Sequence, residues 1–139
     1  MTQEDKDLLL KDLCARLPYG VCYKHFTWDD EREEECIIAA KIYSINSDGY
    51  VKNCYDDETV YIDDVRPYLF PLSSMTEEQC YELASIRSGF QDCWKYIKTP
   101  IPLSICNFEQ IDWFNKNHFD YKGLIKKGLA IDATGLDIY

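Results

Sequence analysis

The stretch AAKIYSINSDGYVKNCYDDETVYIDDVRPYLFPL, residues 39–72, decides the fold that we predict for this chain. It begins inside a long run at 36–45 that is rich in β-branched side chains and partly alternating, as in a strand. The Asn-Ser-Asp-Gly sequence at 46–49 is a strong turn signal, because glycine reaches a positive φ at little steric cost. A second turn at 56–58 precedes another short strand. This succession predicts a small antiparallel barrel or a strongly bent sheet over residues 20–72.

A helix is predicted before this sheet. Thr2 can cap it, the first turn is acidic, and Pro18 ends it. Its apolar stripe consists of Leu9, Leu10, Leu13 and Leu17.

Further helices are predicted after the sheet. Capping patterns begin helices over 77–87 and 108–117, with an extended break at 99–102 between them. Asp120 is expected to cap a short fourth helix that ends at Gly128.

Together these elements predict an α+β protein in three parts. The N-terminal helix occupies 1–19, the barrel-like sheet 20–72, and the short C-terminal helices 73–139, packed on the sheet as one compact unit. Pro67 and Pro71 cannot donate to a β-ladder, so the last segment of the sheet is expected to be an edge strand or a single turn. A length of 139 residues suits a single core.

Negative charge is concentrated in the β region. The chain has 25 acids and 15 bases, a formal net charge of −10, and residues 29–64 hold twelve of the acids and three of the bases. Surfaces that bind nucleic-acid phosphates need clustered Lys and Arg, so direct nucleic-acid binding is not expected. The acids, among them Glu33, Glu34 and Glu35, can be solvated loop tips, a face for a basic partner, or a surface that imitates a phosphate backbone.

The N-terminus and the cysteines point to the cytoplasm. Residues 1–10 are acidic where a secretory signal is basic, and no apolar run of about 18 residues could span a membrane. The seven cysteines form no C-x-x-C pair, which predicts reduced thiols, several of which are expected to pack inward as small apolar groups. His25 and His118 lack zinc-type ligand spacing and the acids at 56–58 lack that of an EF-hand, so no metal or cofactor is expected.

Residues 39–72 resemble the small barrels of Tudor and related Src-homology-type (SH3-like) domains. In those domains a long bent strand leads through an Asp-Gly turn to a return strand, a further strand and a short closing turn. Tudor-like domains often hold a methylated cation against aromatic ring faces. The resemblance implies that role for Trp28, Tyr43, Tyr50, Tyr55 and Tyr61, and packing in the core and across strands is the alternative.

Three longer stretches, LLLKDLCARLPYGV (8–21), RPYLFPLSSMTEEQ (66–79) and DWFNKNHFDYKGLIKKGLAIDA (112–133), are similar to a family of small, uncharacterised proteins. That family is encoded by gut Bacteroidales genomes and their phages or mobile elements. The resemblance implies an intracellular accessory protein of prophage origin, and it carries over no catalytic residue.

A second set of candidate residues lies near the C-terminus. Trp113, His118 and Tyr121 combine aromatic faces with a titratable imidazole close to the carboxylate of Asp120. A docking patch or ligand rim is one interpretation of this set. Helix packing, with Asp120 as a cap, is the other.

These observations favour a non-enzymatic module that binds another protein through aromatic anchors surrounded by an acidic rim. The hypothetical binding residues are Trp28, Glu33, Glu34, Glu35, Tyr43, Tyr50, Tyr55, Trp113, His118 and Tyr121. Two alternatives stay open: an acidic inhibitor that imitates nucleic acid for a host DNA- or RNA-binding protein, and a small enzyme with a cysteine nucleophile beside His25 or His118. No oligomeric state follows from the sequence.

Overall fold

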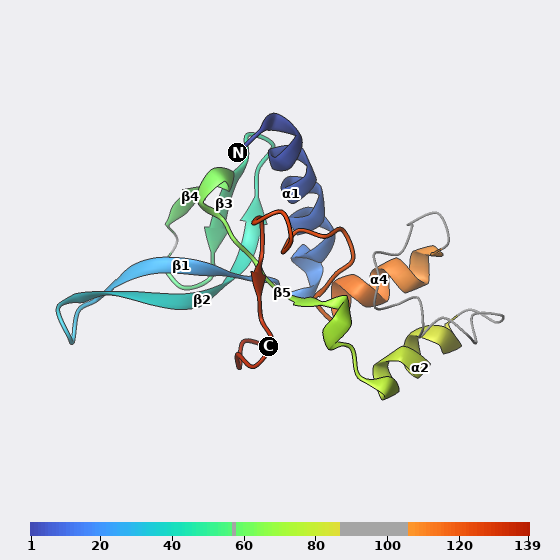
Figure 1. The fold of residues 1–139 in the computed structure, drawn as a ribbon. Helices are drawn as coiled ribbons and strands as arrows, with labels where there is room; N and C mark the ends of the chain where they lie inside the picture. The colour runs from blue at the N-terminus through green and yellow to red at the C-terminus, as the bar shows by residue number, and fades with distance from the viewer. Residues whose placement is uncertain (57, 87–105) are drawn as a thin grey trace.

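A computed structural model describes residues 1–56, 58–86 and 106–139 (Figure 1). Its α-helices (α), 3₁₀ turns (η) and strands (β) follow in the order α1 (Gln3–Arg16), η1 (Leu17–Tyr19), β1 (Cys22–Asp29), β2 (Glu34–Ile45), β3 (Tyr50–Asn53), β4 (Thr59–Tyr61), η2 (Ile62–Asp64), β5 (Tyr68–Pro71), η3 (Leu72–Ser74), α2 (Glu77–Ser85), α4 (Phe108–Lys116), β6 (Phe119–Asp120) and β7 (Ile131–Asp132). The protein is therefore α+β, as predicted. The predicted end of the second helix at 87 and the break at 99–102 lie outside the described residues.

The N-terminal helix α1 forms where its sequence signals place it. Thr2 Oγ1 accepts a hydrogen bond from Asp5 N at 3.1 Å, which satisfies one of the free N–H groups of the first turn. Leu9 and Leu13 are fully buried and pack against the sheet. Pro18 lies in η1 directly after the α-helix, because its ring cannot donate the next helical hydrogen bond.

Strands β1 to β4 form one antiparallel sheet in the order β1-β2-β3-β4. The predicted turn joins β2 to β3: Asn46 Oδ1 accepts hydrogen bonds from Asp48 N and Tyr50 N at 3.0 and 2.9 Å, and Gly49 has a φ of +86°. A register shift in the second half of β2 strengthens the bend of that strand. The sheet curls into half a barrel (Figure 1), which confirms the strongly bent sheet expected here.

The segment between Pro67 and Pro71 differs from the prediction. It forms β5, the central strand of a second sheet of order β6-β5-β7, and both of its pairings are parallel. The prediction of an edge strand or a single turn was wrong because both prolines lie at the ends of this short strand, where no ladder donor is required. Inside the strand, Phe70 N donates to His118 O at 2.8 Å. The second sheet thus joins residues on both sides of the boundary predicted at residue 72.

Helices α2 and α4 both begin with a capping box. Thr76 Oγ1 accepts a hydrogen bond from Gln79 N at 3.2 Å, and Gln79 Oε1 accepts one from Thr76 N at 2.9 Å. Asn107 and Gln110 exchange the same two bonds at 2.8 and 3.1 Å. These reciprocal bonds satisfy N–H groups of the first turn and confirm both predicted starts.

The fourth helix predicted after Asp120 is wrong. The Asp120 carboxylate does accept hydrogen bonds from Leu124 N and Ile125 N at 2.8 and 2.9 Å, as a cap would. However, Gly123 has a φ of +75°, in the left-handed region that a right-handed helix excludes, whereas the +74° of Gly128 suits a residue that follows a helix. The few residues between them form turns instead of a helix.

Three buried clusters hold the elements together, and the smallest contains Cys22, Tyr68 and Ala133. The first lies between α1 and the curled sheet and contains Leu9, Leu13, Val21, Tyr23, Ala40, Ile42, Val51, Ile62, Val65, Leu69, Leu124, Leu129 and Ala130. The second connects α2, α4 and β6 and contains Leu72, Met75, Cys80, Leu83, Trp113, Phe114, Phe119 and Tyr121. In the distal half of the β1–β2 hairpin Ile38 packs against the first cluster, whereas Phe26, Trp28 and Ile37 belong to none of the clusters and are exposed.

Candidate functional site

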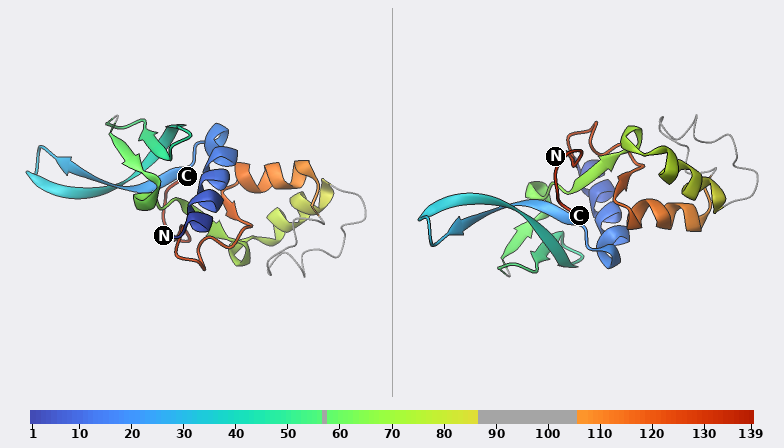
Figure 2. Two further views of the ribbon diagram at one scale, coloured as in Figure 1. Left: turned by 90° about the horizontal axis from the view of Figure 1, so that it is seen from above. Right: turned by 90° about the horizontal axis from the view of Figure 1, so that it is seen from below.

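The distal half of the β1–β2 hairpin projects from the rest of the molecule (Figures 1 and 2). Its two strands pair antiparallel as far as Asp29 and Glu34 at the tip. Strand β3 pairs with β2 only from Ile42 onward, and the bridge on the outer side of β1 lies near its base. Among the residues that the structure describes, no further strand therefore flanks residues 25–39, which we call the arm.

Three large apolar side chains share one exposed face of the arm. Strand alternation puts Phe26 and Trp28 on the same face of β1, and the register places Ile37 of β2 opposite Phe26. Their exposed fractions are 60%, 54% and 53% in the order Phe26, Trp28, Ile37. We call these three side chains the arm stripe. Neighbouring exposed apolar groups of this size are typical of interaction surfaces rather than of an ordinary solvated face.

The tip of the arm is strongly acidic. Residues 29–35 hold six acids and one base. Asp29 Oδ1 shapes the turn by accepting hydrogen bonds from Glu31 N and Arg32 N at 3.0 and 3.3 Å. The predicted rim residues at the tip are all exposed: Glu33, Glu34 and Glu35. Because Glu35 pairs with Trp28 in the register, the negative charge begins directly beside the arm stripe.

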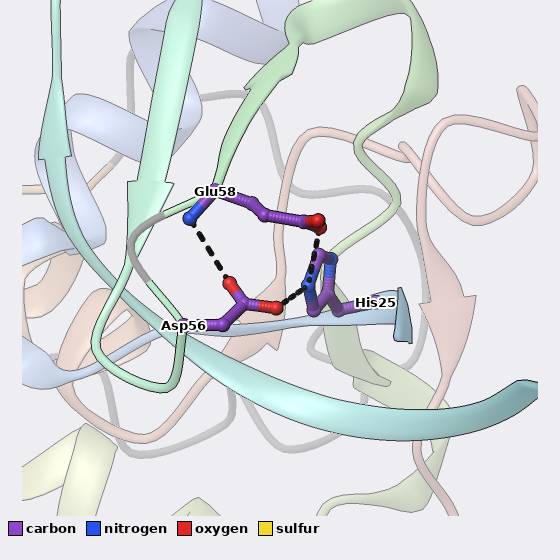
Figure 3. A group of neighbouring side chains, drawn as sticks. All are labelled: His25, Asp56 and Glu58. Carbon is purple, nitrogen blue, oxygen red and sulfur yellow. Dashed lines mark hydrogen bonds and ion pairs between the residues drawn. The ribbon is translucent and has the colours of Figure 1, made fainter. Parts of the chain in front are cut away.

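A polar cluster lies on the opposite face of the arm, at its base (Figure 3). His25 is buried, and its Nε2 lies 2.8 Å from Asp56 Oδ2 and 3.4 Å from Glu58 Oε2. The other ring nitrogen, Nδ1, lies 3.2 Å from the hydroxyl of Tyr23. Asp56 and Glu58 belong to the connection between β3 and β4, so the cluster ties the arm to that connection. We call His25, Asp56 and Glu58 the root cluster.

The carboxylate of Asp56 is held by several donors. Its Oδ2 accepts a hydrogen bond from Thr27 Oγ1 at 3.2 Å, and its Oδ1 accepts from Asn53 Nδ2 and Glu58 N at 3.0 and 3.1 Å. Burial disfavours the ionised form, but the hydrogen bonds from His25, the Glu58 backbone and Asn53 outweigh it and lower the pKa of Asp56 to about 2. Asp56 is therefore ionised at neutral pH.

The structure brings together some of the aromatic residues considered for a cation cage: the rings of Tyr50 and Tyr61 lie 5.3 Å apart. Tyr43 and Tyr50 line an open groove of about 590 Å³ on β2 and β3, and Lys52 lines it too. Trp28 lies on the arm, and Tyr55 is exposed in the turn after β3. The ammonium of Lys52 opposes a cationic ligand in the groove, so the groove does not have the electrostatics of a cage for a methylated amine.

Trp113, His118 and Tyr121 are buried. The Trp113 ring stacks on Phe119 with the centroids 5.6 Å apart, and the His118 ring stacks on Tyr139 with the centroids 3.5 Å apart. Burial lowers the pKa of His118 to about 4, so the imidazole is neutral at physiological pH. Their burial favours packing, the alternative that the sequence left open for this set, and leaves His118 Nδ1 buried without a hydrogen-bond partner in the described residues.

A buried ion pair in α1 is absent from the sequence predictions. Asp12 and Arg16 are both fully buried. Arg16 Nε and Nη2 donate to the Asp12 carboxylate at 2.8 and 3.2 Å, and Nη2 also donates to Phe119 O at 2.6 Å. Lys122 Nζ lies 3.8 Å from Asp12 Oδ1. An i,i+4 pair on a helix is usually exposed, and only the packing of distant residues over α1 distinguishes this one.

The root cluster was also missed, because its members are far apart in the sequence. His25 has no metal ligand at a typical spacing along the chain, whereas in the structure its ring nitrogens face a hydroxyl and two carboxylates. For the arm stripe a signal did exist, since Phe26 and Trp28 alternate with polar residues. No strand over these residues was predicted individually, so this alternation was not used.

Comparisons with protein-family models, with curated proteins and with solved structures find no match for this chain. In the described part of the chain, no helix combines the length and the apolar character that a membrane span requires. The function is therefore argued from two features: the arm, which offers an apolar and acidic surface, and the root cluster, which offers nitrogen and oxygen donors.

Proposed function

We propose that this protein is a non-enzymatic binding module that docks the arm onto another protein. The arm stripe carries the proposal: Phe26, Trp28 and Ile37 are each more than half exposed, and they lie together on an element that projects from the molecule. Tryptophan is enriched among the residues whose truncation weakens protein interfaces most. Burying this stripe removes apolar surface from water, which is the dominant favourable term in association.

The acidic tip indicates the chemistry of the partner. Residues 29–35 carry five more acids than bases, and Glu35 adjoins the arm stripe. A partner with an apolar pocket bordered by Lys and Arg would match both features, and the opposite charges would accelerate encounter. A second copy of this chain is a poorer match, because it would present the same negative charge to the tip.

A capture experiment with matched variants tests the docking. Lysate of the source organism is passed over immobilised wild-type protein, Trp28→Thr, and Tyr81→Gln, and bound proteins are quantified by mass spectrometry. Tyr81 is the control because it is an aromatic residue on α2 with 63% exposure. We expect at least one basic protein to bind the wild type and Tyr81→Gln but not Trp28→Thr. Equal capture by all three would refute docking through the arm.

The charge argument is tested on the purified partner. Changing Glu33, Glu34 and Glu35 together to glutamine should lower the association rate by roughly tenfold at low salt and should flatten its salt dependence. Glutamine at Glu77, Glu78 and Glu109 changes the net charge equally on other exposed surfaces and should have little effect. Association rates of the wild type that are the same at low and high salt would contradict steering by the tip.

Two outcomes would favour a different partner or a different role for the arm. Sedimentation that shows a wild-type dimer, lost in Trp28→Thr, would replace the partner by a second copy of the chain. Displacement of DNA or RNA from the captured protein would instead support the alternative of a nucleic-acid-imitating inhibitor, for which the six acids at the tip are the specific observation. An accessory role in a phage or mobile element is part of the same proposal and rests on the sequence resemblance alone.

A further inference from the structure

We propose that the root cluster binds a divalent transition-metal cation, with Zn²⁺ as the expected ion, through His25 Nε2, Asp56 Oδ2 and a carboxylate oxygen of Glu58 (Figure 3). One ligand atom from each residue lies within 4.8 Å of the other two. The three side chains come from β1 and from the connection between β3 and β4, so a cation there would fasten the arm to the half barrel. This inference is independent of what the arm binds.

Two of the ligand distances in the cluster, those from His25 Nε2 to Asp56 Oδ2 and to Glu58 Oε2, are close to those of a coordination shell. Zinc bonds of about 2.0 Å in a tetrahedral arrangement separate two ligand atoms by roughly 3.3 Å. His25 Nε2 and Glu58 Oε2 are 3.4 Å apart, which already fits. His25 Nε2 and Asp56 Oδ2 are 2.8 Å apart, in a hydrogen bond, so they must separate by roughly half an ångström to admit the ion.

The neighbouring groups orient the ligands. Metal-bound histidines usually engage their second ring nitrogen in a hydrogen bond, and His25 Nδ1 lies 3.2 Å from the Tyr23 hydroxyl. Asn53 Nδ2 donates both to that hydroxyl and to Asp56 Oδ1, at 3.0 Å in each case. Asp56 Oδ1 is thus held by amide donors, while Oδ2 points toward His25. This second layer of hydrogen bonds distinguishes the root cluster from an ordinary group of surface acids.

Protonation is consistent with cation binding. A cation at His25 Nε2 takes the place of the proton that this nitrogen shares with Asp56. In neutral imidazole that proton moves to Nδ1, where the Tyr23 oxygen can accept it, and from imidazolium it is released to solvent.

The donor set also selects the class of ion. An imidazole nitrogen with two carboxylates suits zinc and its first-row neighbours, whereas Ca²⁺ and Mg²⁺ take oxygen ligands. Three protein ligands leave one position for water, on the side where Glu58 is 63% exposed. Thiols are the main competitors for zinc in this chain, and Cys54 is exposed nearby in the sequence, so the test must separate the two.

Titration calorimetry with Zn²⁺ and visible spectroscopy with Co²⁺ test the site on the full chain under reducing conditions. We expect one high-affinity site in the wild type. Glu58→Gln should weaken it about tenfold or more, because losing a ligand is at least as harmful as losing an outer-layer partner. Tyr23→Phe should weaken it about tenfold by removing the partner of His25 Nδ1. Glu33→Gln, an exposed acid at the tip, and Cys54→Ser should bind as the wild type does.

Three results would overturn the proposal. Loss of binding in Cys54→Ser would assign the ion to a thiol site, and unchanged binding in Glu58→Gln would remove the cluster as the ligand set. No heat and no cobalt spectrum at millimolar ion would exclude the site altogether. Glu58 is exposed, so its variant is expected to fold, and circular dichroism of every variant verifies this. None of these readouts depends on the partner of the arm, so failure of the docking proposal would leave them unaffected.

Discussion

Replacing Asp12 by alanine is expected to lower the free energy of unfolding by about 3–5 kcal/mol, the usual effect of removing one member of a buried ion pair. Both side chains of the Asp12–Arg16 pair have 0% exposure. Without Asp12, the guanidinium of Arg16 loses two hydrogen bonds and keeps the one to Phe119 O. The ammonium of Lys122 lies 3.8 Å from the same carboxylate, so without Asp12 no anion would separate it from the Arg16 guanidinium. The expected loss is a large share of the roughly 5–15 kcal/mol that stabilises a typical domain.

Replacing both members of the pair separates the charge effect from the effect of lost contacts. In the double variant Asp12→Leu with Arg16→Met, no buried charge remains at these positions, and the apolar side chains fill similar space. We expect its stability to lie within about 2 kcal/mol of the wild type, because buried pairs are often replaced by apolar groups at little cost. The stability losses of the single variants Asp12→Leu and Arg16→Met should therefore sum to far more than the loss in the double variant.

Urea unfolding followed by far-ultraviolet circular dichroism measures both variants. Asp7→Ala is the matched control, since Asp7 is an exposed acid on the same helix, and it should change stability by about 0.5 kcal/mol or less. A loss below about 1 kcal/mol for Asp12→Ala, or a loss equal to that of Asp7→Ala, would refute the reasoning. If the stability losses of the two single variants add up to the loss in the double variant, Asp12 and Arg16 do not act as a pair.

Two further predictions concern a histidine and a glycine. Burial and the charge of Arg16 lower the pKa of His118 from 6.5 to about 4, so the unfolded chain binds more protons between these values and the folded state loses stability as the pH falls through them. Asparagine tolerates the local φ of +62°, and His118→Asn should lose roughly 2–3 kcal/mol less stability than the wild type when the pH falls from 7 to 4. Identical urea midpoints for the two proteins over this pH range would contradict this. Gly49→Ala should destabilise by about 1–2 kcal/mol, because its φ is +86° and its Cβ would lie 3.2 Å from Ile62 Cγ2. Gly135→Ala has a similar φ of +76° but open space, so thermal unfolding should show a smaller loss for it, and equal losses would exclude the steric contribution.

The features that the sequence predicted well depend on neighbours along the chain. The caps at Thr2, Thr76 and Asn107 join groups three residues apart, and the turn that ends at Gly49 closes over four residues. Such interactions have a small entropic cost of loop closure, and each group has few other partners within reach. Residue type and spacing are therefore sufficient to predict them. The same locality explains one error, since Asp120 has the chemistry of a cap but is followed by Gly123, whose positive φ a right-handed helix excludes.

The candidate site was predicted only in part. The acidic tip and Trp28 were anticipated because charge and aromatic character can be read from single residues. The burial of Trp113, His118 and Tyr121 could not be, because it depends on which surface α4 and the residues after it present to the rest of the molecule.

By itself, then, the sequence determined the first helix, the turn at 46–49, the acidic β region and the starts of both C-terminal helices. Only the tertiary structure decided that β5 lies at the centre of a parallel sheet, that Arg16 reaches Phe119 across 103 residues, and that His25 meets Asp56 across 31. It also decided that nothing in the described residues pairs alongside the arm, which leaves Phe26 and Ile37 exposed. The physical reason is that burial and long-range contact are properties of the packed chain: the same side chain is a core residue or an exposed anchor according to what lies over it.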